Sequence, residues 1–197
     1  MKKILITILA LSISTQIAFA KSKGIENLTR AADGVYRGAR PLNVDEMQAL
    51  SNLGIKSILN LQGGDMESSL WKLISWNEPG EKPEYIAAEK SVAAQFNIAF
   101  TNIPLNSLDP VTADEDKQID QAIEFLHNKN NQPVYVHCEH GKDRTGLVVA
   151  LYKIKYEGMS VDAAYNEWVQ LGHSKKAQIF TGDLDIYFAE KVKELGK

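Results

Sequence analysis

The sequence predicts an α/β protein of one domain, with a mostly parallel central sheet of four to five strands flanked by helices on both faces. Its length of 197 residues suits one domain and leaves little room for two. Apolar, β-rich segments alternate with helical segments along the chain, which is typical of a parallel sheet. The composition, 44% hydrophobic and 24% charged, excludes collagen-like, disordered and multi-pass membrane proteins.

The first twenty residues have the features of an export signal. Two lysines give a positive start, residues 4–13 are almost wholly apolar, and Ala18-Phe19-Ala20 has the small residues that signal peptidase recognises. The apolar run is too short to span a membrane comfortably. We therefore expect cleavage after residue 20 and a mature domain of residues 21–197, periplasmic or secreted, with no stable membrane insertion.

The charge balance weighs against nucleic acid as a partner. The formal net charge is −3, and without the two lysines of the signal the count is 20 basic against 25 acidic side chains. No basic excess exists to neutralise a phosphate backbone, so we expect no nucleic-acid binding. The oligomeric state cannot be read from the residues.

The first half of the mature chain predicts a polar, irregular start followed by a strand, a helix and a second strand. Asn43 and Glu46 form a capping box that begins the helix, and Gly54 ends it where a left-handed residue is needed. The other expected features are irregular residues 21–33, a strand at 35–37, apolar helix positions Met47, Leu50 and Leu53, and a buried strand at 55–61. Residues 65–84 follow no single pattern.

The second half predicts two further strands among five helices. Thr112 and Glu115 form a second capping box, and Ser160 can cap a later helix that Gly172 ends. The expected elements are helix 85–96, strand 98–103, a helix from 112 with Ile119, Ala122, Ile123 and Leu126 buried, strand 133–137, buried helix 146–156, helix 160–171 and a last helix through Leu184, Phe188 and Leu195.

The segment between strand 133–137 and the following buried helix, which is expected to begin near Arg144 or Thr145, carries the candidate active site. It reads His137-Cys138-Glu139-His140-Gly141-Lys142-Asp143-Arg144-Thr145-Gly146. The backbone N–H groups of such a loop can surround an anion, and the positive N-terminus of the following helix adds to their effect. Gly141 permits a backbone turn that other residues resist, and Arg144 can hold two phosphate oxygens through its planar fork.

Cys138, the only cysteine, lies where this loop begins. The dipoles that attract phosphate also favour a thiolate, and a thiolate facing a bound phosphorus is a nucleophile for covalent catalysis. Thr145 can place its hydroxyl near the sulfur and stabilise it as a leaving group. His137 can bond backbone groups and so hold the loop.

The pattern of His-Cys, five residues and Arg-Thr-Gly resembles the signature of the cysteine-based protein tyrosine phosphatase superfamily. Residues 35–41 and 53–61 are similar to the start of compact bacterial dual-specificity-type phosphatases, so the likeness covers most of residues 34–172. Together with the apparent signal, the chain looks closest to periplasmic tyrosine phosphatases of Gram-negative bacteria.

The resemblance implies a hydrolase that removes phosphate through a cysteinyl-phosphate intermediate, without a metal or organic cofactor. It implies catalytic roles for Cys138, Arg144 and Thr145. The residues implied in substrate binding are Glu139, His140, Gly141, Lys142, Asp143 and Arg144, with His137 and Gly146 supporting the loop.

A general acid must protonate the leaving oxygen, a step worth roughly 10²–10⁴ in rate. In the resembling family this acid is an Asp on the loop between a strand and the helix that precedes the signature strand. Asp109 occupies that loop here, although it could also be an ordinary turn residue before Pro110. Asp143 is the rival, because some lipid-active and mycobacterial relatives have the same Gly-Lys-Asp-Arg run.

Other interpretations of the loop fit less well. A nucleotide-binding loop would need Ser or Thr where Asp143 stands, and zinc would need three nearly adjacent ligands at residues 137–140. A rhodanese-type sulfurtransferase would not need Arg144 and Thr145, and an inert buried cysteine leaves the Gly and Arg unexplained. Phosphotyrosine is the first predicted substrate, phosphoinositide or inositol polyphosphate the second, and a phosphate-binding pseudophosphatase the non-enzymatic alternative.

Overall fold

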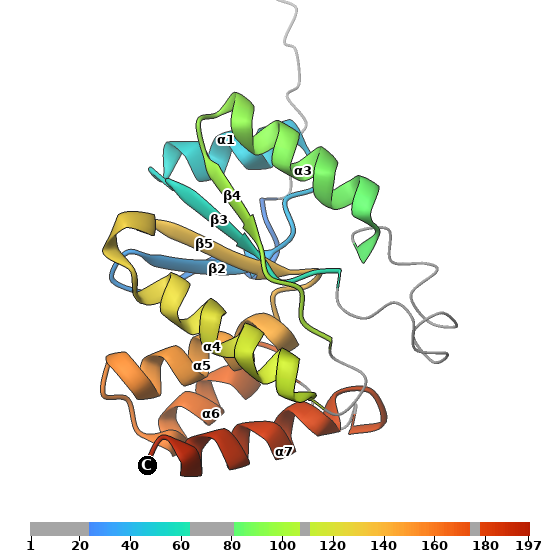
Figure 1. The fold of residues 1–197 in the computed structure, drawn as a ribbon. Coiled ribbons are helices and arrows are strands. Elements are labelled where there is room, and N and C mark those ends of the chain that lie inside the picture. The colour runs from blue at the N-terminus through green and yellow to red at the C-terminus, as the bar shows by residue number, and fades with distance from the viewer. Residues whose placement is uncertain (1–23, 64–80, 107–110, 174–177) are drawn as a thin grey trace, which may run out of the picture.

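Five strands form one sheet in the order β1-β2-β5-β3-β4 (Figure 1). All neighbouring strands run parallel except β1, which is antiparallel to β2. The strands are β1 (Thr29–Ala32), β2 (Val35–Ala39), β3 (Ser57–Asn60), β4 (Ala99–Asn102) and β5 (Val134–Cys138). The predicted mostly parallel sheet is confirmed.

Helices cover both faces of this sheet, as the sequence predicted (Figure 1). On one face lie α1 (Val44–Asn52) and α3 (Pro83–Gln95). On the other lie α4 (Ala113–His127), α5 (Asp143–Tyr156), α6 (Val161–Gln170) and α7 (Gln178–Glu194), with the short 3₁₀ helix η3 (Lys129–Asn131) before β5.

The structure, a computed structural model, describes residues 24–63, 81–106, 111–173 and 178–197. The predicted signal segment and Asp109 lie outside these residues. Within the described ranges, no helix is long and apolar enough to cross a membrane.

Two details of the predicted elements were wrong. Residues 29–32, expected to be irregular, form β1. No residue of β1 is fully buried, so the strand lacks the apolar pattern by which a strand is recognised in a sequence. Leu53 is 43% exposed because α1 ends at Asn52, which places the leucine beyond the buried face. Helix α5 begins at Asp143, one residue before the expected start near Arg144 or Thr145, so the end of the candidate loop belongs to its first turn.

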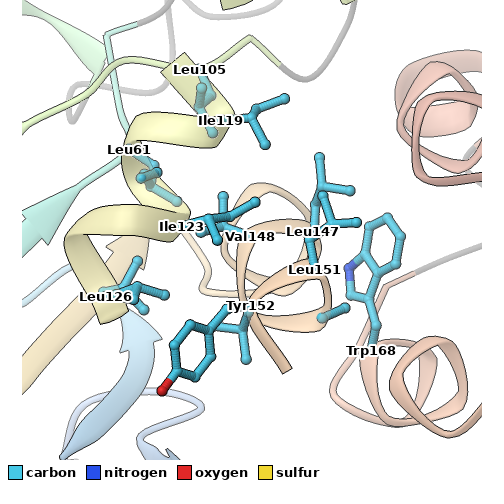
Figure 2. Close-up of a cluster of buried hydrophobic side chains, with 14 of the residues drawn as sticks. Leu61, Leu105, Ile119, Ile123, Leu126, Leu147, Val148, Leu151, Tyr152 and Trp168 are labelled. Carbon is cyan, nitrogen blue, oxygen red and sulfur yellow. The ribbon is translucent and has the colours of Figure 1, made fainter. Parts of the chain in front are cut away.

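Helix α5 is the centre of the larger hydrophobic core, because it packs between the sheet and the helices around it. Figure 2 shows Leu147, Val148 and Leu151 of α5 among side chains of α4 and Trp168 of α6. Full burial of such a side chain contributes about 1.5–3 kcal/mol. Every residue of β5 is also buried, so two rigid elements hold the ends of the loop between them.

Candidate active site

The loop begins at the carboxyl end of β5, where the parallel strands of the sheet end together. Cys138 is the last residue of β5 and is 4% exposed. The strand register pairs it with Ala39 of β2, and it pairs His137 with both Gly38 of β2 and Asn60 of β3. Loops at this edge of a parallel sheet form the usual ligand site of an open α/β fold.

Gly141 brings the middle of the loop directly against β2. Its φ of +69° lies in the left-handed region, and a Cβ atom there would come within 2.2 Å of the backbone of Gly38. On the same strand, Arg37 Nη2 donates to the carbonyl oxygen of Gly141 at 2.6 Å. The loop therefore rests on β2 through a backbone contact that only glycine allows.

The backbone N–H groups of residues 139–143 form the candidate anion cradle. Within the described part of the chain, none of these five groups donates to another protein atom. Lys142 precedes α5 as its N-cap and makes no side-chain capping bond to that helix N-terminus. Consecutive unpaired donors beside a helix N-terminus are suited to a phosphate group.

Arg144, on the first turn of α5, forms a buried ion pair with Glu81. Its Nη2 donates to Glu81 Oε1 at 2.7 Å and its Nη1 to Oε2 at 3.1 Å. Nη1 also donates to the carbonyl oxygens of Leu61 and Leu105, at 3.4 and 3.3 Å. These contacts fix the guanidinium beside the loop, close to the residues that follow β3 and β4.

Glu81 is held as a carboxylate by its surroundings. Burial alone would raise its pKa, but the Arg144 guanidinium, the Gly63 N–H and the Gln62 amide together hold the pKa below its ordinary value of 4.5. The charge of Arg144 is thus compensated within the protein before any substrate arrives. The sequence did not predict Glu81, because it follows the stretch of residues 65–80 that has no clear periodicity.

A chain of polar contacts continues from Glu81 across the edge of the loop. The Gln62 side-chain amide donates to Glu81 at 3.2 Å and to Glu139 at 2.6 Å. Glu139 lies 3.3 Å from Arg40, and both side chains are largely buried. The cation and the acid that flank the loop here neutralise each other.

His137 reaches α3 on the face of the sheet opposite α5. Its Nδ1 lies 3.2 Å from the carbonyl oxygen of Cys138, and its Nε2 lies 2.8 Å from the buried carboxylate of Glu89 on α3. Asn60 donates to the same carboxylate at 2.9 Å. The residue before the nucleophile is thereby tied to β3 and α3, a link that no sequence motif indicated.

Thr145 is fully buried, and its hydroxyl has no hydrogen-bond partner among the described residues. Buried hydroxyls are normally paired, so this one is placed to bond a group that arrives during the reaction. Gly146 follows against Trp168, whose ring leaves no space for a Cβ atom at that position.

Asp143 has a buried partner that the sequence did not indicate. His173 Nδ1 lies 2.7 Å from Asp143 Oδ1, and its Nε2 lies 3.2 Å from Asp185 on α7. The imidazole stacks on Trp168 with ring centroids 3.8 Å apart. Asp143 is therefore engaged in a bridge to the C-terminal helix.

Two further predicted residues, His140 and Lys142, contact the segment that precedes β1. Lys142 forms an ion pair with Glu26 at 3.2 Å, and the carbonyl oxygen of His140 accepts from the Asn27 side chain at 2.8 Å. Asp109 lies outside the described residues, so its place relative to the loop remains a prediction. No cluster of three or more His, Cys, Asp or Glu side chains suited to a metal occurs in the described ranges.

Replacing Gly141 with alanine is expected to lower both stability and activity. The left-handed φ costs a non-glycine residue about 1–2 kcal/mol, and the contact with Gly38 adds a displacement of the loop. A shift of about 1 Å at a reacting centre can reduce the rate about 100-fold. Thermal unfolding and kcat/KM on an aryl phosphate check this.

Gly54→Ala is the matched control, because Gly54 has a similar φ of +76° with open space around its Cβ position. It should lose stability without losing activity. Equal effects of the two substitutions on kcat/KM would contradict the role given to the Gly38 contact.

Comparisons with known proteins agree with this geometry. The model of the tyrosine phosphatase family matches residues 24–194. The chain is 22% identical over 175 residues to the inositol diphosphatase SIW14 of Saccharomyces cerevisiae, covering 86% of this chain and 54% of that protein. It is 28% identical over 141 residues to the dual specificity protein phosphatase TpbA of Pseudomonas aeruginosa, covering 72% of this chain and 52% of TpbA.

Both alignments span about half the length of these relatives. A crystal structure of TpbA matches with a TM-score of 0.59 and 20% identity, covering 85% of this chain and 90% of that one. At this level of identity the structural match shows a shared fold.

Proposed function

The chain belongs to the tyrosine phosphatase family, and from this premise we propose that it hydrolyses phosphomonoesters, with phosphotyrosine in proteins as the main substrate. The observation that carries the proposal is the row of unpartnered N–H groups at residues 139–143, directly after the cysteine and before Arg144. This arrangement suits a bound phosphate next to a thiolate.

In the proposed reaction the Cys138 thiolate attacks the phosphorus, and the bond between phosphorus and the leaving oxygen breaks. The loop amides and Arg144 stabilise the charge on the phosphoryl oxygens. An acid, which we assign to Asp109, protonates the leaving oxygen. Water then attacks the cysteinyl-phosphate and gives a proton to the Asp109 carboxylate, the sulfur–phosphorus bond breaks, and the Thr145 hydroxyl stabilises the departing thiolate.

The charges around the loop favour a substrate with one phosphate. Lys142 is paired with Glu26, and Arg40 is paired with Glu139. The pocket beside the loop has a volume of about 540 Å³. Its lining includes three carboxylates, one arginine and one histidine, which are Glu26, Glu46, Glu139, Arg40 and His140. A polyphosphate would meet few uncompensated cations there, whereas a phosphotyrosine side chain needs only the cradle.

The relatives support two substrate classes. The TpbA structure is described as a complex with phosphotyrosine, and TpbA is named a dual specificity protein phosphatase. SIW14 is named an inositol diphosphatase, which makes inositol phosphates the second candidate. We propose the protein substrate first because of the charge balance around the loop, and we propose that the protein acts after export across the inner membrane.

Phosphate release by residues 21–197 tests the proposal directly. The substrates are phosphotyrosine, phosphoserine and phosphothreonine peptides, a phosphoinositide and an inositol polyphosphate. Highest kcat/KM on phosphotyrosine supports the first candidate, and highest kcat/KM on the inositol compound supports the second. No release from any substrate, with phosphate binding retained, would instead indicate a pseudophosphatase.

Asp109→Asn is expected to lower kcat by roughly 10²–10⁴ on a substrate with a poor leaving group, because the leaving oxygen then receives no proton. In the wild type, kcat should fall at high pH because the acid loses its proton. In Asp109→Asn this fall should be absent. A nitrophenyl phosphate, whose leaving group needs little protonation, should be affected far less.

Asp143→Asn is the comparison variant, because its carboxylate is occupied by His173. It should retain most of kcat and keep the fall at high pH. The acid role moves to Asp143 if its substitution removes that fall and the Asp109 substitution does not.

A further inference from the structure

Arg37 is the most deeply buried cation of the described sheet, at 1% exposure on β2, the strand next to β5. Its Nη2 donates to the Gly141 carbonyl oxygen at 2.6 Å, while its Nε has no hydrogen-bond partner. Within the described ranges, no carboxylate lies within ion-pair distance of its guanidinium. A buried charge without a counter-charge is costly, so a compensating anion is expected close by.

The strand register identifies the group that can supply this anion. Arg37 pairs with Val136 of β5, and Ala39 pairs with Cys138, in adjacent parallel strands. Residues two apart on a strand point to the same face, so Arg37 and Cys138 share the face covered by α5. The buried arginine and the nucleophile are therefore diagonal neighbours on one side of the sheet.

Electrostatics agree with this placement. Burial lowers the pKa of Arg37, and the negative charge at Cys138 opposes that effect more than any other group, followed by Glu167. Tyr135 and Asp143 act in the same direction. A guanidinium remains protonated in proteins, so Arg37 keeps its positive charge on this face of the sheet.

We propose that Arg37 is a positioning residue of the active site, whose buried charge stabilises the Cys138 thiolate while its bond to Gly141 fixes the turn of the loop. This inference rests on the proposed function only in taking Cys138 as the nucleophile. Arg144 would contact the phosphate, whereas Arg37 acts from the opposite, protein side of the loop.

Alkylation by iodoacetamide tests this without any turnover. The chain has a single cysteine, so the rate of alkylation reports on Cys138 alone in the folded protein. In Arg37→Gln, which keeps an N–H donor and loses the charge, the rate at pH 6 should fall about tenfold, the effect expected of a nearby opposite charge. In Arg37→Lys, which keeps the charge, the rate should stay within about twofold.

Arg30→Gln is the control, because Arg30 lies on β1 with an exposed side chain paired to Asp33, and it should leave the rate unchanged. Circular dichroism confirms that each variant is folded. An unchanged rate in folded Arg37→Gln overturns the proposal. If Arg37→Gln does not fold, the alkylation rate of Arg37→Lys is the test. A tenfold fall of that rate would overturn the proposal, because the positive charge is retained in this variant.

These outcomes are distinct from a failure of the proposed function. Absence of phosphate release from the wild type would reject hydrolysis, while the alkylation rates would still measure the effect of Arg37 on the thiol.

Discussion

Cys138→Ser is expected to abolish phosphate release, with a loss on the order of 10⁶-fold, the scale seen when another covalent hydrolase loses its nucleophile. A serine hydroxyl in the same loop remains protonated, because the cradle that favours a thiolate cannot ionise an alcohol to a comparable extent. The measurement is phosphate release under single-turnover and steady-state conditions, with the wild type alongside.

Binding should survive the same substitution. The N–H groups of residues 139–143 and the Arg144 guanidinium are unchanged, so the variant should bind a phosphotyrosine peptide with near wild-type affinity in calorimetry. In the wild type, rapid denaturation during turnover should trap phosphate on Cys138 for detection by mass spectrometry. Residual turnover above one hundredth of the wild type would mean that another group is the nucleophile.

Glu81→Ala should have the largest effect on stability among the loop's supporting residues. Removing one partner of a buried ion pair leaves the other charge uncompensated, which costs about 3–5 kcal/mol. Arg144 would lose the two hydrogen bonds of its fork to Glu81, and the longer ones to Leu61 and Leu105 would hold it less precisely, so kcat/KM should also fall about 100-fold. Denaturant unfolding and kinetics on one phosphopeptide measure the two effects.

Phosphate should partly rescue this variant, because a bound anion replaces the missing carboxylate as counter-charge to Arg144. The rise in melting temperature on adding phosphate should therefore be larger in Glu81→Ala than in the wild type. Glu84→Ala, an exposed acid at the start of α3, is the matched control and should change neither stability nor the phosphate effect. An equal phosphate effect in all three proteins would reject this role of Glu81.

The pH dependence of stability follows from the lowered pKa of Glu81. The folded chain binds this proton less readily than the unfolded chain, so the ion pair contributes fully above pH 4.5. That contribution is lost as the pH falls through the folded pKa. Glu81→Gln cannot titrate, and its stability should fall less steeply with acid than that of the wild type.

The sequence predicted the fold well because its main signals are local. The capping boxes at Asn43 and Thr112 and the apolar run of α5 indicate their helices directly. In both boxes the N-cap side chain accepts the expected hydrogen bond from the backbone N–H of the residue three positions later. β1 was missed because its stability comes from pairing with β2, a contact that composition does not encode. The signature loop was likewise readable, since Cys138, Gly141 and Arg144 lie within seven consecutive residues.

The partners of the loop could not be predicted, because they come from distant parts of the chain. Glu81 lies 63 positions from Arg144, and Arg37 lies 104 positions from Gly141. A single sequence shows that such residues are charged, but only the folded sheet brings them to the same edge. For the same reason His173, next to a helix-ending glycine, gave no indication of its contact with Asp143.

The bridge formed by His173 has a consequence for how this protein can change over generations. Asp143 lies on α5 and Asp185 on α7, and both contact the imidazole of His173 in the loop after α6. The imidazole is fully buried, so loss of either carboxylate leaves it one partner, whereas loss of His173 removes the partner of both carboxylates at once. We therefore expect a substitution of His173 to be tolerated less readily than a substitution of either Asp, because it affects the signature loop and the C-terminal helix together.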